Sequence, residues 1–161
     1  MPPREVTEQG ASCLRALPEM PLYARVDGVV RAGLLIVIEV EVLDFGKSAP
    51  ADMDRVEAAL RADTGHTIKA VLTTHVDTAS SVRTDVAALR ACLDAAGHPA
   101  LLAVDCIASL GCDEFRMDDW GVDVMVAACQ KGLMTPPGMA FVWFSEAARL
   151  RYRSAGQFTC P

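Results

Sequence analysis

The sequence predicts an α/β fold with a mainly parallel sheet that carries helices on both faces. From residue 39 onward, short and nearly continuous apolar segments alternate with longer segments of helical periodicity, which is the pattern of buried parallel strands joined by covering helices. The chain has 161 residues, of which 52% are hydrophobic and 22% are charged, so it is long enough for one domain with a substantial core.

The first expected elements are a strand over residues 39–45, which Gly46 ends, and a helix over residues 51–62. The helix is predicted because apolar residues recur at helical spacing, namely Met53, Val56, Ala59 and Leu60.

Residues 68–73 are expected to form a buried strand, and residues 84–96 a second amphipathic helix with Val86, Leu89 and Leu93 on its apolar face. Gly97 marks the end of this helix. The remaining strands are expected at residues 100–104, 122–127 and 139–144.

Composition excludes several classes of partner. The net charge of −6 argues against nucleic acid and against an anionic membrane surface. Charged residues interrupt the longest apolar stretch, residues 29–43, and residues 1–5 open no signal peptide. The six cysteines show no C-x-x-C spacing, so reduced thiols and a cytoplasmic location are expected.

Polar side chains follow three successive strands of the expected sheet. His75 and Thr78 come after the strand at residues 68–73, Asp105 after the next, and Gln130 and Lys131 after the third. In an open α/β sheet, ligands bind beyond the carboxyl ends of the strands. An amine, a carboxylate and a hydroxyl are also the groups that a pyridoxal cofactor requires for its aldehyde carbon, its ring nitrogen and its ring hydroxyl.

Each of these residues also has an ordinary structural explanation. Lys131 taken alone is a solvated surface lysine, Asp105 caps the segment that follows it, and His75 is a buried histidine with a hydrogen-bond partner. Thr78, with the serines that follow it, fits an ordinary turn. The combination favours a functional site with Lys131 as a desolvated nucleophilic amine. The three histidines show no metal-ligand spacing, and no G-x-G-x-x-G motif follows a strand.

Three motifs, taken in order, resemble the class V, fold-type I pyridoxal-phosphate aminotransferases, and the alanine–glyoxylate and serine–glyoxylate group in particular. The motifs are His75-x-Asp77-Thr78, Val104-Asp105-x-x-Ala108-Ser109-Leu110-Gly111, and Gln130-Lys131-Gly132-Leu133 followed by Pro136-Pro137-Gly138. The similarity covers residues 39–155. It implies that this segment is part of the large domain that binds pyridoxal 5'-phosphate.

The resemblance also implies a role for each candidate residue. Lys131 would form the Schiff base with the cofactor and carry the catalytic proton, and Asp105 would pair with the pyridinium nitrogen. Thr78 and Gln130 would hydrogen-bond the cofactor, Ile107 would pack on its ring, and His75 would shape the pocket floor.

The activity implied by the resemblance is amino-group transfer from a small amino acid to a 2-oxo acid such as glyoxylate, in a family that forms homodimers. Cysteine desulfurases share the fold, but they have a histidine where this chain has Gln130. The family's phosphate-binding loop, its substrate-binding arginine and its C-terminal small domain have no counterpart in this sequence. Residues 1–38 and the tail 156–161 do not resemble the family. A truncated central fragment is therefore expected, and the alternative function is a catalytically silent fragment with at most weak cofactor binding.

Overall fold

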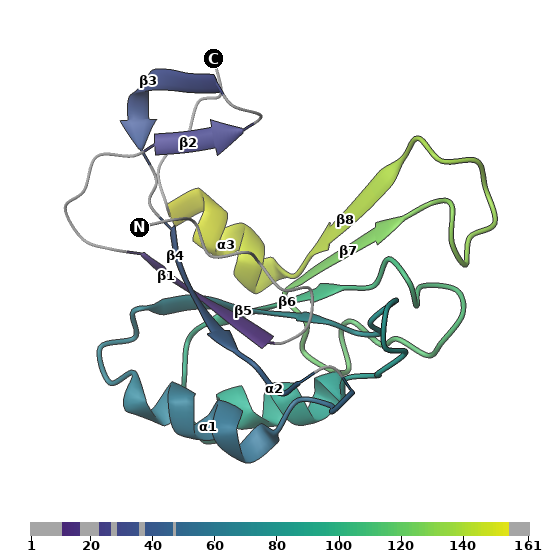
Figure 1. The fold of residues 1–161 in the computed structure, drawn as a ribbon. Coiled ribbons are helices and arrows are strands. Elements are labelled where there is room, and N and C mark those ends of the chain that lie inside the picture. The colour runs from purple at the N-terminus through teal and green to yellow at the C-terminus, as the bar shows by residue number, and fades with distance from the viewer. Residues whose placement is uncertain (1–10, 17–22, 27–28, 36–37, 47, 155–161) are drawn as a thin grey trace.

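The computed structural model describes residues 11–16, 23–26, 29–35, 38–46 and 48–154, with side chains from residue 40 onward. Its main feature is a six-stranded sheet of order β4-β1-β5-β6-β7-β8, beside a separate two-stranded pair, β2-β3 (Figure 1). The strands are β1 (Ala11–Ala16), β2 (Tyr23–Val26), β3 (Val29–Leu35), β4 (Ile38–Leu43), β5 (Ile68–Thr74), β6 (Leu101–Asp105), β7 (Val124–Ala128) and β8 (Ala140–Phe144).

The centre of the sheet is parallel, as predicted. β5 pairs in parallel with β6, and β6 with β7. β1 lies antiparallel between β4 and β5, and β8 runs antiparallel to β7, so β4, β5, β6 and β7 share one direction. The expected strands are confirmed to within about two residues, which is the usual uncertainty of element ends.

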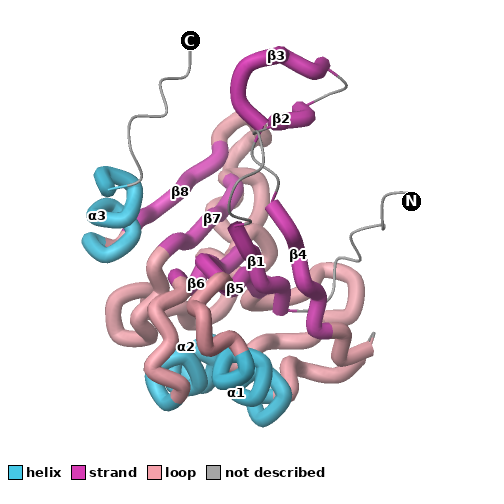
Figure 2. The backbone as a smooth tube through the Cα atoms, turned by 90° about the vertical axis from the view of Figure 1, so that its left-hand side faces the viewer, coloured by secondary structure: helices cyan, strands magenta, loops and turns pink. Residues whose placement is uncertain are grey.

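Helices lie on both faces of the sheet. α1 (Met53–Ala62) and α2 (Val86–Ala95) pack side by side against one face, and α3 (Glu146–Ser154) lies on the other, next to β8 (Figures 1 and 2). The two predicted helices are confirmed, whereas α3 was not predicted. Among the described residues, no helix is long and apolar enough to cross a lipid bilayer.

The core lies between the central strands and the α1–α2 pair. Because side chains alternate along a strand, every second residue of β5, β6 and β7 turns toward these helices. The core residues are Val56, Leu60, Ile68, Val71, Val86, Leu89, Cys92, Leu93, Ala100, Leu102, Val104, Cys106, Val122 and Met125. The intervening residues, such as Leu101, Ala103 and Asp105 of β6, turn to the opposite face and are only half-buried.

Local signals set both helix starts. Asp52 Oδ1 accepts hydrogen bonds from the backbone N–H groups of Asp54 and Arg55 at the start of α1. Asp85 Oδ1 accepts one from Ala88 N, at 2.9 Å, at the start of α2. Such caps satisfy amides that have no partner within the helix. α2 ends where Gly97 takes a φ of +59°, as its position in the sequence predicts.

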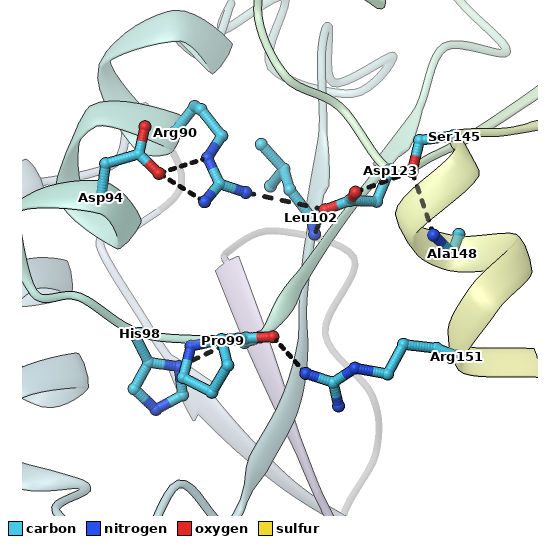
Figure 3. A network of polar contacts seen from close by, with 10 residues as sticks. Arg90, Asp94, His98, Pro99, Leu102, Asp123, Ser145, Ala148 and Arg151 are labelled. Atoms are coloured by element: carbon cyan, nitrogen blue, oxygen red, sulfur yellow. Dashed lines mark hydrogen bonds and ion pairs between the residues drawn. The ribbon is translucent and has the colours of Figure 1, made fainter. Parts of the chain in front are cut away.

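Asp123 holds together the end of the sheet that lies opposite the carboxyl ends of the central strands (Figure 3). Its Oδ2 accepts a hydrogen bond of 2.9 Å from Leu102 N and lies 3.6 Å from Arg90 of α2. Its Oδ1 accepts a hydrogen bond of 2.8 Å from Ser145 Oγ, which in turn caps the start of α3 at Ala148 N. This one carboxylate therefore links α2, β6 and the β8–α3 junction.

Candidate functional site

A pocket of about 480 Å³ lies beyond the carboxyl ends of β5 and β6. The segment after β5 contributes Thr74, Val76, Asp77 and Thr78, and the segment after β6 contributes Asp105, Ile107 and Ala108. The structure thus brings together three of the six predicted site residues, Thr78, Asp105 and Ile107, where an α/β sheet is expected to bind its ligand.

Asp105 ends β6 on the face of the sheet that α1 and α2 leave uncovered. Its Oδ1 accepts a hydrogen bond of 2.7 Å from the backbone N–H of Ile107, and its carbonyl oxygen accepts one of 2.9 Å from His75 N. Among the described residues, Oδ2 accepts no hydrogen bond. The local turn therefore fixes one carboxylate oxygen and leaves the other able to accept a hydrogen bond from a ligand in the pocket.

The loop after β5 is held by Asp77 rather than by Thr78. Asp77 Oδ2 accepts hydrogen bonds from Ser80 N at 2.9 Å and from Ser80 Oγ at 2.5 Å, which is an Asx-type turn. Ser81 donates its N–H to Asp77 O and has a φ of +60°. Thr78 is exposed and lines the pocket, whereas Ser80 is held in the turn.

His75 turns to the core side of the sheet. It follows Val71 and Thr73, both buried, in the alternation of β5, and its side chain is 1% exposed. Its ring does not line the pocket, and Nδ1 lies 2.9 Å from Ser109 Oγ. Burial lowers the pKa of His75, with Asp113 opposing and Arg83 reinforcing the shift, so the imidazole is uncharged at neutral pH. A direct contact between His75 and a cofactor stays a prediction.

Gln130 and Lys131 are exposed on the loop that joins β7 to β8, outside the lining of the pocket. Cys129 closes this loop at its base: its N–H donates to Met139 O, its thiol to Pro136 O, and its carbonyl accepts from Thr135 Oγ1. The sequence led us to expect a desolvated Lys131, but the lysine lies exposed because it falls past the end of the buried strand.

A contact between two glycines places the Lys131 loop against the Asp105 loop. A Cβ on Gly132 would overlap the carbonyl oxygen of Leu110 and would lie 2.8 Å from Cys112 Sγ. Gly111, with a φ of +83°, packs against Gly132 from the other side. The two backbones therefore approach more closely than larger residues would allow. Sequence reasoning missed this contact, although both glycines stand in the quoted motifs.

The Cys106 thiol, next to Asp105 in the chain, is not a reactive centre. Cys106 is fully buried, and burial raises the pKa of its thiol to about 12, so it stays protonated. Within the described part of the chain, no three His, Cys, Asp or Glu side chains gather in a way that could hold a metal ion.

Comparison with known proteins relates this geometry to one family. The family model for class V aminotransferases matches residues 35–156. The chain is 55% identical over 104 residues to L-aspartate–glyoxylate aminotransferase of Paracoccus denitrificans. The matched region covers 65% of this chain and 26% of that protein. It is also 43% identical over 123 residues to serine–glyoxylate aminotransferase of Methylorubrum extorquens. That matched region covers 76% of this chain and 30% of the relative.

Solved structures agree with this relationship. Pyridoxamine–pyruvate aminotransferase from Mesorhizobium loti superimposes with a TM-score of 0.58 at 30% identity, over 65% of this chain and 26% of that one. Aspartate aminotransferase from Thermus thermophilus superimposes with a TM-score of 0.61 at 28% identity, over 69% of this chain and 30% of the Thermus chain. The chain thus spans less than a third of the length of these relatives, and it belongs to the class V aminotransferase family.

Proposed function

We propose that this chain binds pyridoxal 5'-phosphate in the pocket at the carboxyl ends of β5 and β6, and that it serves amino-group transfer from a small amino acid to a 2-oxo acid. The observation that carries the proposal is the Asp105 carboxylate, which has one oxygen fixed by Ile107 N and the other without a hydrogen bond from the described residues, in a wall shared with Thr78.

The residues of the pocket fit the cofactor. Its volume of about 480 Å³ falls within the range of cofactor-sized pockets. Asp105 Oδ2 would accept a hydrogen bond from the ring nitrogen and hold it protonated, and Ile107 would pack against the ring. Thr78 and Gln130 offer hydrogen bonds to the polar groups of the cofactor, and His75 supports the floor from the core side.

Lys131 is the proposed attachment point and proton carrier. Its four-carbon stem lets Nζ reach away from the exposed loop, and the Gly111–Gly132 contact sets that loop beside the segment of Asp105. The cofactor, when bound, supplies a carbonyl carbon for the amine and a ring that withdraws electrons from the substrate. The free amine of Lys131 would remove the proton from the substrate α-carbon as a general base and would then, as a general acid, deliver that proton to the carbonyl-derived carbon of the cofactor.

The names of the relatives support a substrate class. The names of the two bacterial relatives contain L-aspartate or serine as the amino acid and glyoxylate as the 2-oxo acid. Small amino acids as donors, with glyoxylate as the acceptor, are therefore the first substrates to test on this chain.

A second candidate function is cofactor binding without turnover. It is favoured by the position of Gln130 and Lys131, both exposed and outside the lining of the pocket. Catalysis depends on holding reacting groups within a fraction of an ångström of their productive geometry, whereas binding is less demanding.

One assay separates the two functions. The purified chain, loaded with pyridoxal phosphate, is given serine, alanine or aspartate with glyoxylate, and glycine formation is measured. Transamination predicts turnover that falls by about 10²–10⁴-fold in Lys131→Arg, which keeps the charge but cannot transfer the proton. Saturable cofactor binding without glycine formation supports the second function, and equal turnover in Lys131→Arg contradicts the role of Lys131.

A further inference from the structure

His75 and Ser109 form a buried polar pair beneath the turn that carries Asp105. Each side chain is 1% exposed, and His75 Nδ1 lies 2.9 Å from Ser109 Oγ. Because a buried polar atom without a partner destabilises the fold, this contact gives His75 Nδ1 and Ser109 Oγ a partner each. The pair joins the loop after β5 to the loop after β6.

The same histidine contacts the turn at both of its ends. Its backbone N–H donates to Asp105 O at 2.9 Å, and its ring meets Ser109, four residues further along. Between them, Ser109 N donates to Cys106 O at 3.1 Å, and Ile107 N donates to Asp105 Oδ1 at 2.7 Å. The orientation of the Asp105 carboxylate therefore depends on a turn that His75 holds at its start and at its end.

Two aromatic rings, those of Phe115 and Trp120, pack against the ring of His75. The ring centroids of Phe115 and Trp120 lie 5.3 and 5.9 Å from that of His75, and 5.3 Å from each other. Because His75 and Ser109 are both buried, the hydroxyl and the imidazole Nδ1 have each other rather than solvent as partners. Neither His75 nor Ser109 lines the pocket, so their effect on it must pass through the turn.

We infer that Ser109 and His75 are positioning residues for Asp105: their buried contact sets the direction in which the Asp105 carboxylate enters the pocket. The use of that carboxylate by a cofactor rests on the proposed function. The orientation of the carboxylate is a property of the chain itself and is measurable without any cofactor.

The test is nuclear magnetic resonance of the cofactor-free chain, with Ser109→Ala as the first variant. The two signals to follow are the amide proton of Ile107 and the carboxyl carbon of Asp105. In Ser109→Ala, the hydrogen bond from Ile107 N should lengthen, so the amide proton shifts upfield and its solvent exchange becomes about tenfold faster. The amides of Leu89 and Leu93 in α2 should keep their wild-type signals.

Ser145→Ala is the matched control. It also removes a hydroxyl that contacts an aspartate, since Ser145 Oγ donates to Asp123 Oδ1 at 2.8 Å, but at the opposite end of the sheet (Figure 3). It should leave the Ile107 and Asp105 signals unchanged. His75→Asn, which keeps a polar atom close to the place of Nδ1, should keep them nearer to wild type than His75→Leu.

A folded Ser109→Ala chain with wild-type Ile107 and Asp105 signals overturns the inference, and so does a Ser145→Ala chain that shifts them equally. If Ser109→Ala does not fold, the comparison of His75→Asn with His75→Leu decides: signals that shift in His75→Leu and stay near wild type in His75→Asn support the inference, and signals that are the same in both folded variants overturn it. A separate titration of the wild type with pyridoxal phosphate tests the proposed function, so either statement can fail without the other.

Discussion

Asp105 and His75 show how the alternation of a strand assigns different tasks to neighbouring polar residues. Asp105 continues the half-buried series of β6 and faces the pocket, whereas His75 continues the buried series of β5 and faces the core. The sequence alone identified both residues, because each stands directly at a strand end. It did not distinguish their faces, although counting in steps of two from Val71 would have placed His75 in the core.

Asp63 is the residue whose titration matters most for stability. It is 7% exposed, and its carboxylate accepts hydrogen bonds from Thr67 N, Thr67 Oγ1 and Ile68 N, with His98 Nε2 at 3.2 Å. Burial by itself raises the pKa of Asp63, but these contacts outweigh it and hold the pKa well below its usual range.

We therefore expect Asp63→Asn to lower the free energy of unfolding by about 1–3 kcal/mol at pH 7. Because the folded-state pKa is lowered, the ionised carboxylate stabilises the fold above about pH 4, and this contribution is lost as the pH falls further. Urea unfolding at several pH values measures it. A difference between wild type and variant that stays constant from pH 7 to pH 3 would contradict the assignment.

Helices and strands differed in how far local sequence determined them. α1 and α2 were predicted because their caps and apolar spacing are local: Asp52 and Asp85 bond their own first turns. β1 was not predicted from the sequence, because Ala11–Ala16 has no run of β-branched residues. This strand forms by pairing with β4 on one side and β5 on the other. The Gly111–Gly132 contact was missed for the same reason, since it joins loops that are distant in sequence.

α2 should be the helix whose core contact costs most to remove. Leu93 is fully buried between α2 and the central strands, so Leu93→Ala should lower the free energy of unfolding by about 2–5 kcal/mol. Ala91→Ser, on the exposed side of the same helix, should change it by no more than about 0.5 kcal/mol. Denaturant unfolding of the two variants compares them directly. Equal losses would mean that α2 does not pack on the sheet as described.

On the scale of the whole molecule, the two faces of the sheet are covered unequally. The α1–α2 face holds the continuous core, whereas the other face, within the described part of the chain, meets α3 beside a cavity of about 650 Å³ bounded by Leu101, Val124 and Phe144. On β8, Val142, Trp143 and Phe144 are 48%, 40% and 58% exposed. The candidate site lies at the carboxyl edge of this unevenly covered sheet.

The sequence predicted that residues at the strand ends would gather at one edge of the sheet, but it did not predict which of them line the pocket. Thr78, Asp105 and Ile107 meet in one pocket, since parallel strands bring their carboxyl ends to a common edge. Lys131 is exposed because it lies past the end of β7, on a loop whose base is closed by the hydrogen bonds of Cys129. Strand periodicity contains no signal for such a loop.

Lys131 is the residue proposed to hold the cofactor, and the composition of the chain makes its labelling directly measurable. The sequence contains only three lysines, Lys47, Lys69 and Lys131. The chain is incubated with pyridoxal phosphate, reduced with borohydride and mapped by peptide mass spectrometry, with Lys131→Arg as the control. We expect a pyridoxyl group on Lys131 that is absent from the control. Labelling confined to Lys47, Lys69 or the N-terminal amine, or equal labelling of the control, would contradict it.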